Sequence, residues 1–290
     1  MKTVETVKEL RSCLRPLRDR RIGLVPTMGY LHEGHVSLIR KAREECDVVV
    51  LSVFVNPLQF GPQEDFARYP RDLERDARIA EQAGVDFLFA PPVEEMYPQQ
   101  PLTKVTVSQL TDRLCGASRP GHFDGVATVV AKLFHIVEPD RAYFGMKDAQ
   151  QVAVVEQMVR DLHFPVTVVP CPTVREEDGL ALSSRNVYLS AEERSQATVL
   201  SAGLREVAEK VKRGEMTLAS QAIDYLKRRI SSKPLARIDY VDVLAFPELT
   251  PVKELTGRRV IVAVAVRFGS TRLIDNIILH EKEDLPCSAR

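Results

Sequence analysis

The sequence predicts an α/β protein in which a Rossmann-like parallel sheet forms a nucleotide-binding domain and a smaller α+β domain follows. Through the first two-thirds of the 290 residues, short runs that are apolar at nearly every position alternate with amphipathic helical stretches. Strands of that kind are buried on both faces of a parallel sheet. After about Thr173 the pattern changes to two helices and then three apolar runs, which favours an antiparallel sheet. We therefore expect domains at residues 1–173 and 174–290.

The first domain should alternate strands and helices along the chain. The apolar run 22–25 predicts the first strand, and the helical spacing of Val36, Ile39 and Ala42 predicts a helix over 35–45. The same reasoning places further strands at 48–55, 85–90, 142–144 and 166–169, with helices at 73–83, 126–137 and 149–162.

The second domain begins with a helix signal. Ser190 followed by Glu193 has the spacing of a capping box, which predicts a long helix that ends near Lys212. A second helix is expected over 218–230, and strands are expected at 238–244, 260–266 and 273–279. The charged tail 281–290 is expected to be disordered.

Composition excludes several classes of protein. Lys+Arg and Asp+Glu are equal at 40 each, so no net charge attracts nucleic acid or an anionic membrane surface. The first residues contain no apolar run of signal-peptide length, and no later run approaches a membrane span. The 5 cysteines include no Cys-x-x-Cys pair, which favours a reducing cytoplasm.

The segment 26–35, PTMGYLHEGH, places His32 and His35 where the first strand gives way to a helix. The first N–H groups of a helix lack internal partners and carry the positive end of its dipole, so a phosphate is stabilised there. Two imidazoles one turn apart add two directed donors. The segment is therefore typical of an anion site.

The histidine spacing also excludes competing sites. A zincin helix needs histidines four residues apart, and here they are closer; the chain also lacks a Walker A run and a dinucleotide glycine fingerprint. Two interpretations remain at this point. One is the His-x-Gly-His signature of nucleotidyltransferases, in which a nucleophile attacks the α-phosphate of ATP, and the other is a purely structural histidine pair.

Two more polar segments follow predicted strands, and the carboxyl ends of parallel strands meet at one edge of the sheet. Asn56 and Gln59 follow the second strand and suit a hydroxylated or carboxylate ligand, although taken alone an Asn-Pro turn with a capping Gln is the simpler interpretation. Lys147 and Asp148 join a short strand to a helix. They suit a phosphate and a ribose, or they form a solvated pair at a helix start.

Two loops complete the set of candidates. Ser183, Ser184 and Arg185 form a polar loop suited to the outer phosphates of ATP, or an ordinary serine-rich linker. Arg119 and His122 lie in a glycine-bounded loop that contacts substrate or is a plain surface loop. A thiol nucleophile at Cys115 with His122 as its base is disfavoured, because nothing in the sequence activates the cysteine.

These signals in this order resemble one family, the pantothenate synthetases, which are the pantoate–β-alanine ligases of coenzyme A biosynthesis. The resemblance spans almost the whole chain and rests on PTMGYLHEGH, VFVNPLQFGPQEDFARYPR, GASRPGHFDGVATVV, YFGMKDAQQ and LALSSRNVYLS. Most members carry alanine at Tyr30 and methionine at Leu182, so this chain departs at both positions.

The resemblance implies a role for most of the candidates. The ATP site would consist of Met28, Gly29, Tyr30, Leu31, His32, Glu33, Gly34, His35, Gly145, Met146, Lys147, Asp148, Val174, Leu182, Ser183, Ser184 and Arg185. His35 would be the catalytic acid, helped by His32 and Lys147, while Gln59 and Gln151 would bind pantoate. We add Asn56, Arg119 and His122 as substrate-binding candidates, and Asp76 as the expected Mg²⁺ ligand.

The implied reaction condenses pantoate with β-alanine through a pantoyl adenylate, with ATP as a substrate, Mg²⁺ as the metal and a homodimer as the assembly. The basic chemistry agrees, because a carboxylate reacts with an amine only after its poor leaving group is replaced, and adenylation does this. The first alternative is a simple adenylyltransferase of the same superfamily. The second is a nucleotide-binding regulatory or scaffold module without catalysis, which the presence of His32, His35 and Lys147 disfavours.

Overall fold

The computed structural model describes residues 1–62 and 64–279 and divides into two compact units. The first unit contains Met1–Glu176 with Ala181–Ser184, and the second contains Glu177–Leu180 with the described residues from Arg185 to Leu279. The expected charged tail, 281–290, lies outside the described residues. Among the described residues, no helix is both long enough and apolar enough to cross a membrane.

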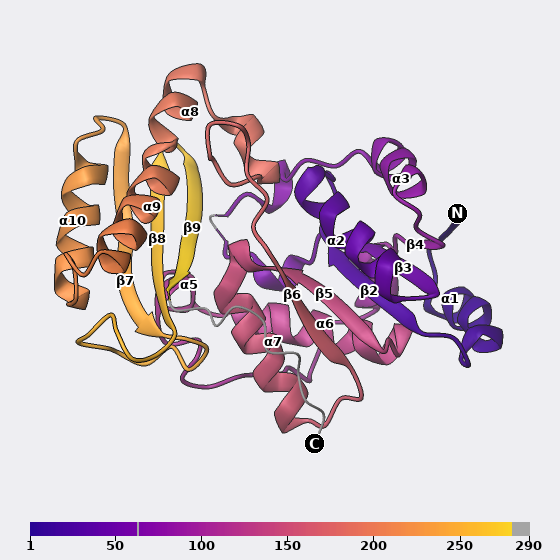
Figure 1. Cartoon of the computed structure of the whole chain (residues 1–290). Coiled ribbons are helices and arrows are strands. Elements are labelled where there is room, and N and C mark those ends of the chain that lie inside the picture. Colours follow the sequence, from indigo (N-terminus) through magenta and orange to yellow (C-terminus); the bar gives the residue numbers. More distant parts are fainter. Residues whose placement is uncertain (63, 280–290) are drawn as a thin grey trace. The chain divides into compact units, whose positions relative to one another are not determined.

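The first unit is built on a sheet of six strands in the order β1-β4-β3-β2-β5-β6, and every neighbouring pair is parallel. Figure 1 labels β2 to β6 of this sheet, coloured from indigo to rose. The predicted Rossmann-like sheet is thereby confirmed. The strands are β1 Lys2–Val4, β2 Ile22–Thr27, β3 Val48–Val53, β4 Phe87–Phe89, β5 Arg141–Gly145 and β6 Thr167–Cys171.

This strand order has a switch point between β2 and β5. From β2 the chain builds outward through β3 and β4 on one side, and β5 and β6 then extend the sheet on the other side. Connections that diverge in this way leave a crevice at the carboxyl ends of the two central strands, where ligands of α/β proteins bind. The residues that follow β2 and β5 are therefore brought together by topology alone.

Helices cover both faces of this sheet, as the buried residues show. Val25, Leu51 and Leu88 form one cluster with Ile39 of α2 and Ala80 of α3. The alternate strand positions are also buried, so a second layer covers the other face. The helices of the unit are α1 Val7–Leu14, α2 Glu33–Glu45, α3 Leu73–Gln82, α4 Val93–Met96, α5 Leu114–Ser118, α6 His122–Val137 and α7 Ala149–Asp161.

Short elements and exact ends were the parts that the sequence prediction missed. β1 is a three-residue edge strand and α1 has eight residues, both too short for a clear period. Helix α6 begins at His122, earlier than expected, because Gly121 adopts φ 80° and turns the chain into the helix. The 3-10 turns of the unit and its border are η1 Arg15–Leu17, η2 Pro57–Gln59, η3 Phe66–Arg68, η4 Met146–Asp148 and η5 Ser184–Tyr188.

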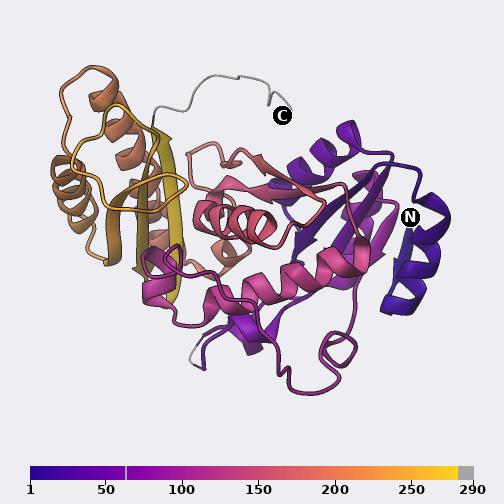
Figure 2. The ribbon, with the colours of Figure 1, turned by 90° about the horizontal axis from the view of Figure 1, so that it is seen from below.

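The second unit is the predicted α+β domain. Its antiparallel sheet contains β7 Ala236–Ala245, β8 Val260–Phe268 and β9 Thr271–Leu279 in that order, and α10 Ala219–Ser231 and α9 Val199–Lys212 share its apolar core (Figure 2). The capping box of Ser190 and Glu193 is confirmed. The expected single long helix is wrong, because the chain forms α8 Ala191–Ala197 and then begins α9 after Thr198.

Candidate active site

His32 and His35 together close the amino terminus of α2. His32 is the N-cap residue, and its Nδ1 accepts a hydrogen bond from the Gly34 amide at 3.1 Å. The His35 Nδ1 accepts one from the His32 amide at 3.3 Å. This is the reciprocal pattern of a capping box, made here by two imidazoles. The ring centroids lie 4.0 Å apart.

These hydrogen bonds fix the tautomer of both rings. Because each Nδ1 accepts from a backbone N–H, the proton of the neutral ring is on Nε2, and Nε2 is left as a donor. Burial, reinforced by the charge of Lys147, lowers the pKa of His32 to about 4. Burial also lowers the pKa of His35, with the charges of His32 and Lys147 acting in the same direction. At neutral pH the pair therefore presents two uncharged donors.

Lys147 lies close enough to both rings to contribute to these shifts. It is in η4, directly after β5, and its side chain is 20 % exposed. Its Nζ is 3.9 Å from the Asp148 carboxylate. Because β5 pairs with β2, Lys147 follows its strand at the same edge of the sheet as the histidine pair.

The serine segment approaches the same loop. The Ser184 hydroxyl donates to the Tyr30 carbonyl at 3.3 Å, and the Leu182 amide donates to the Val174 carbonyl at 3.0 Å. A Cβ on Gly34 would lie 3.7 Å from the Leu182 Cβ and 2.8 Å from the His32 ring, so only glycine fits there. Arg185 belongs to the second unit, and its contact with phosphate stays a prediction.

The loop between β2 and α2 is held by Asp76. Gly29 has φ 82° and Tyr30 has φ 52°, a left-handed pair that costs free energy unless it is held by its surroundings. The Asp76 carboxylate accepts hydrogen bonds from the amides of Tyr30 and Leu31, both at 2.7 Å. Asp76 is 1 % exposed, and burial raises its pKa while the two amides oppose that shift.

The expected role of Asp76 as a metal ligand stays a prediction, and its contacts show what else it does. Both carboxylate oxygens already accept from backbone amides. Over residues 1–62 and 64–279, no three His, Cys, Asp or Glu side chains gather as a metal site would need. The neighbouring side chain is also a cation, Arg75, which stacks on the Tyr30 ring at 5.0 Å. Asp76 is therefore a residue that shapes the histidine loop.

Gln59 lies in η2, just past the end of β3, and is 9 % exposed. Its amide nitrogen donates to the Met28 sulfur at 3.2 Å, and its amide oxygen accepts from Asn56 at 3.1 Å. Asn56 is 1 % exposed, and its second N–H donates to the Gly125 carbonyl at 3.0 Å. The Tyr97 hydroxyl donates to the Asn56 oxygen at 2.9 Å. Asn56 thus holds the Gln59 side chain in place through a hydrogen bond to its amide oxygen.

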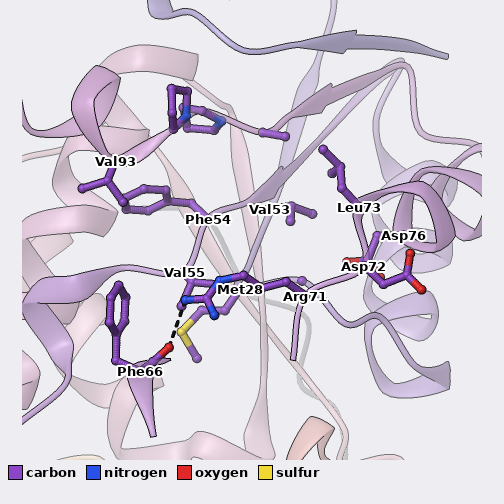
Figure 3. A pocket seen from close by; sticks show the side chains of 14 residues that line it. Met28, Val53, Phe54, Val55, Phe66, Arg71, Asp72, Leu73, Asp76 and Val93 are labelled. Carbon is purple, nitrogen blue, oxygen red and sulfur yellow. Dashed lines mark hydrogen bonds between the residues drawn. The ribbon is translucent and has the colours of Figure 1, made fainter. Parts of the chain in front are cut away.

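A cavity of about 230 Å³ is lined by Met28, the residue whose sulfur accepts from Gln59, and by residues that follow β3 and β4. Figure 3 shows Met28, Phe54 and Val93 lining it with apolar surface, and Arg71 on its polar side. Because Met28 lines the cavity and also accepts from Gln59, a polar group and an apolar wall lie next to each other. Such a combination suits a small acid that carries alkyl groups.

The two adjacent glutamines of α7 have different environments. Gln150 is 6 % exposed and makes three hydrogen bonds, to the Cys115 amide and to the carbonyls of Leu110 and Arg113. Gln151 is only partly buried, and its side chain makes no hydrogen bond to another residue in the described part of the chain. Gln150 is thus structural, while Gln151 is available to a ligand.

Arg119 and His122 contact protein groups. Arg119 forms a two-point ion pair with Glu64, at 2.6 and 2.7 Å, and both Arg119 and His122 reach the Gln59 carbonyl. Neither Glu64 nor Tyr97 is predicted from the sequence, because their partners lie far away along the chain. A polar residue whose role depends on contacts with distant segments has no local sequence pattern that would identify it.

The comparisons with known proteins agree with this geometry. The family model described as pantoate-beta-alanine ligase matches residues 2–278. A pantothenate synthetase of Geobacillus kaustophilus is 59% identical over 282 residues, covering 97% of this chain and 93% of the relative. One of Acetivibrio thermocellus is 58% identical, covering 97% of this chain and 100% of the relative.

Solved structures show the same similarity in three dimensions. A pantothenate synthetase of Thermus thermophilus superposes with a TM-score of 0.90 at 54% identity, covering 96% of this chain and 99% of that one. A pantoate-beta-alanine ligase of Francisella tularensis, complexed with beta-gamma ATP and beta-alanine, has a TM-score of 0.80 at 34% identity. It covers 96% of this chain and 97% of that one.

Proposed function

The chain belongs to the pantoate–β-alanine ligase family, and we propose that it activates pantoate at the His32–His35 site before joining it to β-alanine. The enzyme is an ATP-dependent ligase that forms pantothenate. Our proposal concerns the route: pantoate attacks the α-phosphate of ATP, pyrophosphate leaves, and the amine of β-alanine then displaces AMP. One observation carries it, namely that His32, His35 and Lys147 converge at the helix start beside the switch point.

The geometry suits attack on the α-phosphate because the site consists of donors. In the transition state, negative charge builds on the phosphate oxygens and on departing pyrophosphate. The two Nε2–H donors, the Lys147 ammonium and the positive end of the α2 dipole are all complementary to that charge. Since both rings are neutral near pH 7, we propose that they stabilise charge as hydrogen-bond donors and that His35 is not an ionised acid.

The outer phosphates would be bound by the serine segment. Ser184 is fixed to the Tyr30 carbonyl, so its place beside the histidine loop is set before ATP binds. Ser183 and Arg185 flank it along the chain and would complete the phosphate contacts. Val174, joined to Leu182 by a backbone hydrogen bond, would contact the nucleotide in the same region.

Pantoate would lie between the nucleotide and the amide of Gln59. It carries a carboxylate, two hydroxyls and a pair of methyl groups, so it needs polar and apolar contacts together. Gln59 and Gln151 would bind the polar groups, and the apolar wall of Met28 and Phe54 would cover the methyls. Because an acyl phosphate or adenylate hydrolyses easily, this enclosure would also keep water from the activated carbonyl.

Magnesium, the assembly and the compartment complete the proposal. Mg²⁺ usually enters nucleotide sites on the phosphates themselves with few protein ligands, which agrees with the engagement of Asp76 by amides. The roles proposed for His32, His35 and Lys147 do not depend on the metal ion. A homodimer follows from the family resemblance, and a cytoplasmic location is supported by the free thiols of Cys13, Cys46, Cys115 and Cys171.

The test is product analysis of the purified enzyme with ATP, pantoate and β-alanine. The proposal expects pantothenate, AMP and pyrophosphate in equal amounts, and it expects pyrophosphate but no pantothenate when β-alanine is left out. Release of ADP and phosphate would indicate that the intermediate is an acyl phosphate and not an adenylate. A product that retains AMP would favour the simple adenylyltransferase.

A further inference from the structure

The backbone of Gln59 is fixed by side chains from a different part of the chain. Its carbonyl oxygen accepts two hydrogen bonds, from His122 Nδ1 at 2.8 Å and from Arg119 at 3.3 Å. Gln59 is the last residue of η2, and the Phe60 amide donates back to the Pro57 carbonyl. The peptide that follows Gln59 is therefore held at the point where the short turn ends.

The hydrogen bonds determine how His122 is protonated. An arginine N–H can only donate, so Arg119 donates to His122 Nε2 at 3.0 Å, and the ring proton must be on Nδ1. Nδ1–H is then the donor to the Gln59 carbonyl. Burial and the Arg119 charge lower the pKa of His122 to about 4, so this neutral form persists at physiological pH.

Glu64 orients the guanidinium that fixes this arrangement. Its two oxygens face Arg119 Nε and a terminal nitrogen at 2.6 and 2.7 Å, the planar fork that arginine forms best with a carboxylate. The Gly61 amide also donates to Glu64 at 3.0 Å. Burial alone would raise the pKa of Glu64, but the hydrogen bonds and charge of Arg119 lower it to about 2.

The opposite side of η2 packs tightly against helix α6. A Cβ on Gly125 of α6 would clash with the Leu58 carbonyl oxygen, so the helix backbone lies directly against η2. Asn56 joins the same helix through the Gly125 carbonyl and also holds the Gln59 amide oxygen. Gln59 is thus held at its backbone and at its side chain, and these contacts restrict the orientation of its side-chain amide.

We propose that Glu64, Arg119 and His122 form a positioning cluster that aims the Gln59 amide at the acid substrate, an inference that rests on the proposed function. The three side chains need not touch pantoate. A binding group must be held within about half an ångström by its own supporting contacts to be effective. The cluster supplies these contacts for Gln59, so its loss should weaken recognition of the acid and leave the ATP site unchanged.

The experiment compares two substitutions of His122 in the full-length enzyme. His122→Ala removes the donor to the Gln59 carbonyl. His122→Asn keeps an N–H close to the position of Nδ1 and removes the rest of the ring. We expect His122→Ala to raise the KM for pantoate roughly 3- to 10-fold, with the KM for ATP and kcat changed less than about twofold. His122→Asn should restore most of the lost affinity.

A second pair of variants distinguishes the effect of losing this cluster from a general effect of substitutions near helix α6. Glu64→Gln weakens the fork and should raise the KM for pantoate about as much as His122→Ala. Lys104→Ala removes an exposed ion pair of 3.0 Å with Asp124, in the first turn of the same helix, and should change neither KM. Urea unfolding of each variant confirms that the compared proteins are folded.

The inference fails if His122→Ala leaves the KM for pantoate unchanged, or raises both KM values equally. It also fails if His122→Asn is no better than His122→Ala, because the ring would then matter only for packing. Failure of the proposed function is a different result, since the unmodified enzyme would form no pantothenate.

Discussion

Asp76→Asn tests whether this carboxylate shapes the histidine loop or binds a metal. Asp76 accepts two amide hydrogen bonds at 2.7 Å, from Tyr30 and Leu31, in a position that is 1 % exposed. Asparagine is nearly the same size but has one acceptor atom, so one of the two amides would face an NH₂ group. The left-handed turn at Gly29 and Tyr30 would then lose half of its support.

The size of the effect follows from those two bonds. A hydrogen bond to a charged group contributes about 1.5–3 kcal/mol, and a neutral replacement contributes roughly 0.5–1.5 kcal/mol. One bond is weakened and one is lost with its amide left buried, so we expect a loss of about 3 kcal/mol in the free energy of unfolding. Because His32 lies only two residues after Tyr30, displacement of its ring should lower kcat by roughly 100-fold.

The assay is urea unfolding together with pyrophosphate release over a range of Mg²⁺ concentrations. Asp72→Asn is the matched control, since Asp72 lines the same cavity but caps α3 through the Arg75 amide, a role that asparagine fills as well. If Asp76 were a metal ligand, Asp76→Asn would keep its stability and need about tenfold more Mg²⁺. That result would refute the loop-holding role.

Three further predictions concern the donors, the glutamines and pH. His35→Ala should lower single-turnover adenylation by roughly 100-fold with folding retained, and a near-normal rate would remove it from the catalytic set. Gln150→Leu should lower the free energy of unfolding by about 2–3 kcal/mol, because it removes three hydrogen bonds. Gln151→Leu should leave the free energy of unfolding unchanged and weaken pantoate binding about tenfold in calorimetry. If Gln151→Leu lost stability and Gln150→Leu lost pantoate binding, the two roles would be exchanged. Burial is the main cause that lowers the pKa values of His32 and His122 to about 4, so the unfolded chain binds more protons below pH 6.5. Stability should therefore be full above pH 6.5 and fall toward pH 4, and a urea midpoint that is constant over that window would contradict the shifts.

Features with a local period or a local cap were predictable from the sequence. The strands β2 and β3 and the helix α2 follow from runs of apolar residues, and their order implies the parallel sheet that brings His35 and Lys147 to one edge. The capping box at Ser190 also follows from a four-residue pattern.

Features that depend on packing between distant segments were not predictable. Substrate contact by Arg119 and His122 stays a prediction, and the sequence does not indicate that their polar atoms bind Glu64 and the Gln59 carbonyl. The metal at Asp76 stays a prediction, and the sequence does not indicate that two backbone amides donate to this carboxylate. In each case the residue type was informative, but its partner was fixed by the tertiary fold.

Oxygen-isotope transfer tests the central claim, attack of the pantoate carboxylate on the α-phosphate, most directly. Pantoate labelled with ¹⁸O in its carboxylate would be turned over with ATP and β-alanine, and the products would be analysed by mass spectrometry. If the acyl adenylate forms at the His32–His35 site, one labelled oxygen must leave with AMP. Label in inorganic phosphate, or in no phosphorus-containing product, would contradict this account.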